Sequence, residues 1–198
     1  MKNEVNRAFM AKKKVFSVMV ALLMALSMNV NAAQRGKFIH VDASVNKNLK
    51  PQIAFCQEHK DGKDVTTMIV KTVNTNEFNE FSDESRILLR FADGKVVRLN
   101  RVPGMEVKKD KRTEKVARST LTKYWTETTY EVSPEVIAEL EAGVAVIKVR
   151  VVFKANDAKD YDIAEGYQPR MAADLLKSYQ EAALNNKKSN TDLSDEDF

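Results

Sequence analysis

Polar and apolar side chains alternate from residue 37 to residue 45, which is the pattern of a β-strand with one buried face. The apolar positions are Ile39, Val41, Ala43 and Val45. Similar stretches predict further strands at 52–58, 66–73, 123–132 and 160–164. A stronger one at 143–153 has an apolar face made of Ala145, Ile147, Val149, Val151 and Phe153.

The region around Gly94 predicts a β-hairpin, because an Asp-Gly dipeptide separates two apolar runs. A two-residue turn would mix polar and apolar groups on each face. A three-residue loop instead pairs Leu89 with Val97 and Ile87 with Leu99, which gathers the apolar groups on one face. We therefore predict the second register, with Gly94 in a left-handed conformation within a bulge.

Two helices are predicted. Residues 133–143 place Ser133 at the N-cap and Gly143 just beyond the end, and residues 169–185 have apolar side chains at helical spacing. The segment between strands 123–132 and 144–153 is near the minimum length for a parallel crossover, so their relative direction stays open.

These elements predict a β-rich α+β fold: a mainly antiparallel curved sheet or sandwich with one short inserted helix and a C-terminal helix packed on it. We divide the chain into a cleaved signal peptide (1–32), a single domain (33–186) and a disordered acidic tail (187–198).

The signal peptide is inferred from a basic head after Met10, a short apolar run, and small residues at Val30 and Ala32. Which methionine starts the chain stays open. We expect a bacterial protein that is exported to the periplasm or secreted, and that is not an integral membrane protein after cleavage. The full chain has 32 basic and 28 acidic residues, and cleavage would bring the two totals into balance. A general basic field for nucleic acid is therefore not expected.

Two features are candidates for binding. A basic run at 102–119 is either a solvated loop or a patch for an anionic glycan, lipid headgroup or acidic partner. Trp125 lies on a polar strand face and is either covered by a neighbouring element or forms a shallow carbohydrate-stacking surface. The candidate binding residues are Trp125, Lys108, Lys109, Lys111 and Arg112.

The sequence gives little support for a catalytic site or a metal site. His40, Asp42 and Ser44 project in parallel from one strand face, so they do not form a catalytic triad. A metal site at His40 and Asp42 would need a third ligand, such as His59 or Glu58, from another strand. We assign no catalytic residue, metal or cofactor.

Cys56, the single cysteine, is a small buried hydrophobe, a reactive thiol or half of an intermolecular disulfide. No nucleophile-elbow, phosphate-loop or zinc-protease motif occurs. We predict a non-catalytic binding or envelope-associated module, a monomer or weak oligomer, with an unknown protein or glycan partner and no nucleic acid. The alternatives are a hydrolase of an extracellular polymer with paired carboxylates, and a structural subunit that assembles by edge-strand addition.

Overall fold

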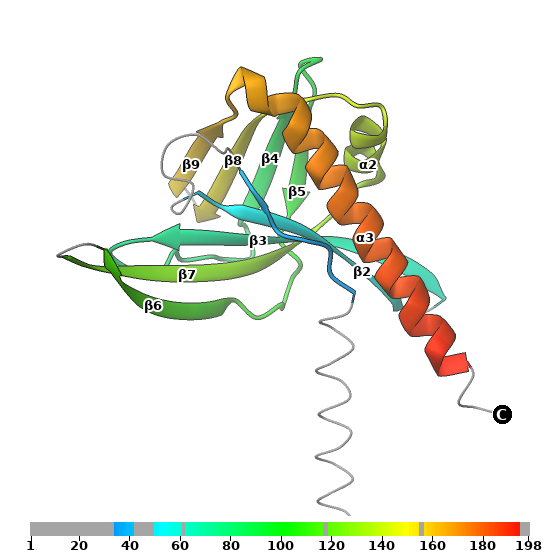
Figure 1. The fold of residues 1–198 in the computed structure, drawn as a ribbon, viewed down its shortest axis with the longest axis horizontal. Coiled ribbons are helices and arrows are strands. Elements are labelled where there is room, and N and C mark those ends of the chain that lie inside the picture. The colour runs from blue at the N-terminus through cyan, green and yellow to red at the C-terminus, as the bar shows by residue number, and fades with distance from the viewer. Residues whose placement is uncertain (1–33, 42–49, 61, 117–118, 155–156, 195–198) are drawn as a thin grey trace, which may run out of the picture.

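The computed structural model describes residues 34–41, 50–60, 62–116, 119–154 and 157–194, and its strands form two antiparallel sheets (Figure 1). The predicted signal peptide lies outside these residues. Sheet A has the order β1 (Ile39–His40), β2 (Gln52–Lys60), β3 (Lys63–Asn74), β7 (Ser119–Glu131), β6 (Lys108–Val116). Sheet B has the order β5 (Val96–Asn100), β4 (Arg86–Phe91), β8 (Val146–Lys154), β9 (Asp157–Asp162).

The helices complete the predicted fold class, which is confirmed. Helix α2 (Pro134–Glu141) connects β7 to β8, and the 3₁₀ turn η2 (Glu165–Tyr167) leads into α3 (Gln168–Ser194). Strands β7 and β8 belong to different sheets, so they form neither a parallel nor an antiparallel pair. The two sheets run across one another in Figure 1, and α3 crosses in front of both.

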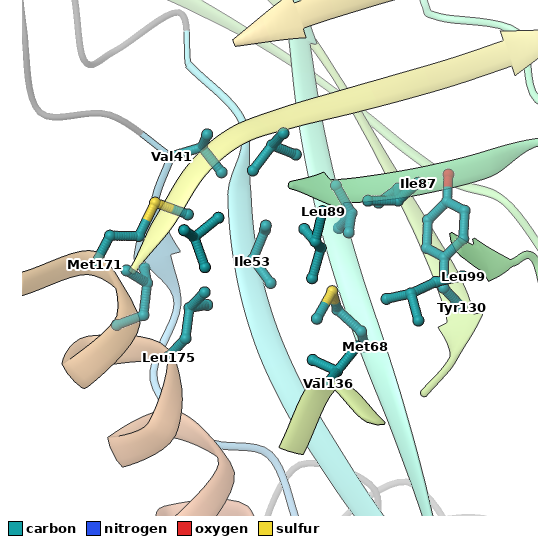
Figure 2. Packing of buried hydrophobic residues seen from close by; sticks show 14 of the residues in the cluster. Val41, Ile53, Met68, Ile87, Leu89, Leu99, Tyr130, Val136, Met171 and Leu175 are labelled. Atoms are coloured by element: carbon teal, nitrogen blue, oxygen red, sulfur yellow. The ribbon is translucent and has the colours of Figure 1, made fainter. Parts of the chain in front are cut away.

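One hydrophobic core joins both sheets to both helices (Figure 2). Met171 and Leu175 of α3 pack near Val41 and Ile53, and Val136 of α2 packs near Met68. Sheet B contributes the alternate residues of its hairpin and of β8: Ile87, Leu89, Phe91, Val97, Leu99, Val146, Val149, Val151 and Phe153. The apolar residues that alternate along these strands therefore form the packing interface between the two sheets.

Helix α3 is longer than predicted. It packs on β2 and continues to Ser194, whereas the sequence predicted its end at residue 185 and a disordered tail from residue 187. Residues 195–198 lie outside the described part. The end of the helix was predicted from the last apolar residue of its buried face. A helix that is already docked can extend beyond that residue, because each added residue forms one more backbone hydrogen bond without having to be buried.

The β4–β5 hairpin has the predicted register. Leu89 pairs with Val97, and Ile87 pairs with Leu99. The φ of Gly94 is +91°, and its amide donates to the carbonyl of Phe91 at 3.0 Å. The left-handed glycine is thus a requirement of this turn.

We expect Gly94→Val to lower the free energy of unfolding by about 1–2 kcal/mol, because a branched residue is strained at this φ. No atom lies within 4 Å of the added Cβ, so the loss comes from the backbone alone. Urea unfolding followed by circular dichroism measures it. Gly94→Asn should recover part of the loss, since asparagine tolerates positive φ. Equal stability of the valine variant and the natural protein would contradict this turn geometry.

Strand β8 departs from the predicted alternation at a β-bulge. Phe91 pairs with Val146 whereas Arg90 pairs with Lys148, so Ile147 is the extra residue. Val146 is buried in the core, and Ile147 and Ala145 are only partly buried. Placing Ala145 and Ile147 on the core face was therefore wrong, because one inserted residue reverses the faces of the strand before it.

The basic run is largely not a loop. Residues Lys108–Val116 form β6, which pairs along its length with β7. The described side chains Lys108 to Lys115 are all exposed, so β6 is an edge strand with water on both faces. No apolar alternation can mark such a strand, which explains why it was predicted as a loop.

Ser178 of α3 holds the chain before β1 against β2. Its hydroxyl accepts a hydrogen bond from the amide of Phe55 at 3.2 Å and donates one to the carbonyl of Lys37 at 2.8 Å. Beside it, the Gly36 amide donates to the Phe55 carbonyl at 2.9 Å. The helix hydroxyl therefore bridges β2 and the segment before β1, and Gly36 lies against the helix backbone.

Candidate ligand-binding site

Trp125 lies on the face of sheet A that points away from the core, midway along β7. It pairs with Val73 of β3 and with Asp110 of β6. Paired residues of an antiparallel sheet share a face, so all three project to the same side. Tyr130 projects to the opposite side and is fully buried. Trp125 is only partly buried, so no element covers it fully.

A hollow of about 340 Å³ opens beside this tryptophan. We call it the Trp125 pocket. It combines one aromatic ring with carboxylates, cations and an amide from β2, β3, β6 and β7. Its lining residues are Gln52, Lys71, Lys108, Lys109, Asp110, Arg112, Trp125 and Glu127.

The charges of the Trp125 pocket are arranged as ion pairs. Glu127 lies between two ammonium groups, with Lys71 Nζ at 3.4 Å and Lys108 Nζ at 3.8 Å. Arg112 Nε contacts Asp110 Oδ2 at 2.7 Å. The pocket therefore offers hydrogen-bond donors and acceptors side by side, with four cations and two carboxylates among its lining residues.

A second aromatic ring adjoins the pocket through Lys71. The ammonium of Lys71 lies 4.7 Å from the ring centre of Phe38, and the guanidinium of Arg35 lies 4.6 Å from the same ring. Gln52 also connects the pocket to the N-terminal segment, because its amide nitrogen lies 3.1 Å from Nε2 of His40. These contacts orient the β2–β3 side of the pocket.

The structure brings together most, but not all, of the predicted binding residues. Trp125, Lys108, Lys109 and Arg112 line the pocket. Lys111 does not, because it projects from the opposite face of β6, where its ammonium lies 5.3 Å from the ring centre of Tyr124. The ammonium of Lys109 also reaches to that side, where it lies 5.5 Å from the ring centre of Phe78.

Sequence reasoning missed the contributions of β2 and β3. Gln52 and Lys71 pair directly with each other, and Lys71 pairs with Glu127. Once the strand order is known, the alternation of side chains along each strand places these residues on the same face of the sheet as Trp125. No other feature of the sequence indicates that they belong to the pocket. Strand order depends on contacts between segments far apart in the chain, so the sequence pattern did not supply it.

The suggested metal ligands do not converge. His40 pairs beside Gln52 at the start of β2 and His59 lies near its end, which places them about 23 Å apart along the strand. Asp42 and Ser44 lie outside the described residues. Within the described ranges, no three His, Cys, Asp or Glu side chains are grouped as a metal site would require.

Cys56 is half-buried on β2, and its surroundings do not activate it. Burial raises the pKa of its thiol, and the nearby carboxylate of Glu58 raises it further. A nucleophilic cysteine needs the opposite shift, toward the thiolate. The environment therefore favours the small-hydrophobe interpretation.

Comparison of the chain with protein-family models, curated proteins and solved structures finds no match. Among the residues that the structure describes, no helix is both long enough and apolar enough to cross a membrane. The functional argument therefore depends on the geometry of the molecule itself.

Proposed function

We propose that this protein is an exported, non-catalytic binding module that holds a glycan in the Trp125 pocket. The observation that carries the proposal is the partly exposed Trp125 ring beside Asp110 and Glu127 in one hollow. The apolar face of a sugar ring can stack on an indole. Its hydroxyl groups can donate to the carboxylates and accept from the ammonium and guanidinium groups around them.

The paired charges favour a sugar over a simple anion. Lys71, Lys108 and Arg112 each already contact a carboxylate, so a phosphate or sulfate would have to compete with Asp110 and Glu127 for these cations. A sugar uses donors and acceptors together. The ion pairs also hold the carboxylates in position before the ligand arrives, which lowers the entropy lost on binding.

We expect Trp125→Ala to weaken glycan binding about 30-fold, since truncating a central aromatic contact costs roughly 2 kcal/mol. Trp125 is the one tryptophan of the chain, so its intrinsic fluorescence reports on the pocket without a label. Fluorescence titration of the natural protein with soluble hexasaccharides, both neutral and uronic-acid types, identifies a sugar that binds. Calorimetry then measures the affinity of the Trp125→Ala variant for that sugar.

Lys111→Ala is the matched control, because this residue lies on the same hairpin but on the opposite face. It should bind like the natural protein. Unchanged affinity in Trp125→Ala, or no fluorescence response to any of these sugars, would reject the Trp125 pocket as a glycan site.

A hydrolase is the second candidate, because Asp110 and Glu127 line the same hollow. A glycosidase needs one carboxyl group that stays protonated, usually in apolar surroundings. Each carboxylate here lies in contact with a cation instead. Binding without release of reducing ends supports the module, and release that Glu127→Gln abolishes would support the enzyme.

Assembly by edge-strand addition is disfavoured at two described edges. Strands β6 and β9 are edge strands, and both carry closely spaced charges. Charged edge strands discourage pairing with another chain. These two edges therefore do not favour a self-assembling subunit.

A further inference from the structure

The face of sheet B that points away from the core carries cations in a planar array. Leu88 of β4 pairs with Arg98 on one side and Arg150 on the other, and Arg90 pairs with Val96 and Lys148. Residues paired in this way share a face. We call this surface the arginine face, and its cations are Arg86, Arg90, Arg98, Lys148 and Arg150.

Part of this charge has no counter-ion among the residues that the structure describes. Asp162 pairs with Lys148 at 2.9 Å and Asp160 pairs with Arg150 at 2.7 Å. No ion pair within the described part of the chain involves the three remaining cations, which are Arg86, Arg90 and Arg98. The arginine face therefore keeps a surplus of positive charge although β9 supplies two carboxylates.

The placement of Arg90 is unfavourable for folding. It pairs directly with Lys148, and like charges opposite each other destabilise a sheet. The burial of neighbouring core residues does not require a cation at either position, because both project away from the core. An anionic layer over the face would offset this repulsion, because it would attract both cations.

The arginine face is open to water around Arg90 and Arg98, whereas Val152, which pairs with Arg86, is buried. Val96 is 53% exposed, and Leu88 is partly buried. Together with Arg90, Lys148 and Arg150 they line a shallow hollow of about 300 Å³. The core side chains of β4, β5 and β8 pack on the other side of the sheet, with both helices. The exposed apolar groups thus lie among the cations.

We propose that the arginine face docks on the surface of an anionic phospholipid bilayer. The cations spread in two dimensions, over three strands about 4.8 Å apart and rows about 7 Å apart. A linear polyanion would contact one line of them, whereas a plane of headgroups contacts all of them. Val96 and Leu88 would face the interfacial region. The Trp125 pocket lies on the other sheet, so this proposal does not depend on the glycan site.

The test is co-sedimentation with vesicles of phosphatidylcholine, with and without 30% phosphatidylglycerol by composition. The chain from Ala33 is used, because the apolar segment before it would partition into lipid by itself. Every residue of the described core lies between 39 and 182, and a melting curve checks that this form is folded. We expect binding to the anionic vesicles at low salt, and its loss at high salt.

The double variant Arg90→Gln/Arg98→Gln should weaken this binding about 30-fold, since each cation near such a surface contributes about fivefold. Lys111→Gln/Lys115→Gln removes the same charge from exposed positions on β6 and should bind almost as tightly as the natural chain. Trp125→Ala should also keep its vesicle binding.

Three outcomes would overturn the proposal. They are no binding to anionic vesicles at low salt, equal losses in the two double variants, and binding to soluble polyglutamate without binding to vesicles. The last outcome would assign the face to an acidic polypeptide.

Discussion

Phe55→Ala is expected to lower the free energy of unfolding by about 3–5 kcal/mol, the range for removing a buried aromatic ring. Phe55 is fully buried on β2, and its ring meets that of Tyr179 on α3 edge to face, with 5.8 Å between ring centres. Truncation would leave a cavity between the sheet and the helix. A typical domain has a stability of about 5–15 kcal/mol, so the variant would lose a large share of it.

Urea unfolding followed by circular dichroism measures the loss, and Phe38→Ala is the control. Phe38 is only partly buried and belongs to no described core contact, so its removal should cost less than half as much. Similar losses in the two variants would contradict the docking of α3 on β2.

Gly36→Ala is expected to lower the free energy of unfolding by about 3 kcal/mol through overpacking. An added Cβ would lie 1.9 Å from the carbonyl oxygen of Ser178 and 2.7 Å from its carbonyl carbon. These are backbone atoms of α3, so no side-chain rotation can relieve the clash. Either the helix or the N-terminal segment must move, and the hydrogen bonds of the Ser178 hydroxyl would be strained.

Gly166→Ala is the matched control, because an added Cβ there meets no atom within 4 Å and the φ is not positive. Its stability should stay within about 0.5 kcal/mol of the natural protein. Thermal and urea unfolding of both variants measure the difference. A Gly36→Ala protein as stable as the Gly166→Ala protein would show that the chain before β1 does not lie against α3.

Strands with one buried face were predicted well from the sequence. The β4–β5 register followed from Leu89, Val97 and their neighbours, because a one-residue slip would expose the whole core set. Helix α2 likewise begins and ends beside Ser133 and Gly143, as the capping pattern indicated. In each case the burial of apolar groups and the local backbone preference favour the same structure.

Strand β6 and the bulge in β8 were not predictable in this way. Strand β6 is exposed on both faces, so burial leaves no periodic mark on its sequence. The extra residue Ile147 in the bulge turns the preceding residues of β8 to the opposite face of the sheet. The position of the bulge is set by pairing with the neighbouring strand β4. Both features depend on a neighbouring strand rather than on the local sequence.

The arginine face, too, could not be predicted from the local sequence alone, because its charges come from strands that are distant in the chain. Arg90 and Arg98 lie on the face of the β4–β5 hairpin opposite the predicted apolar pair Leu89 and Val97. Charge totals over the whole chain conceal such a surface, because the carboxylates lie elsewhere. Only the pairing of β4 with β8 adds Lys148 and Arg150 to the same plane.

The amino-acid sequence by itself determined most of the buried residues outside the bulge of β8, where most strands and the helices lie, and that Trp125 lies on a polar strand face. The tertiary structure alone decided that Lys71, Asp110 and Glu127 surround this tryptophan. The physical reason is that side-chain parity along a strand is a local property, whereas strand order and register arise from backbone hydrogen bonds between segments distant in the chain.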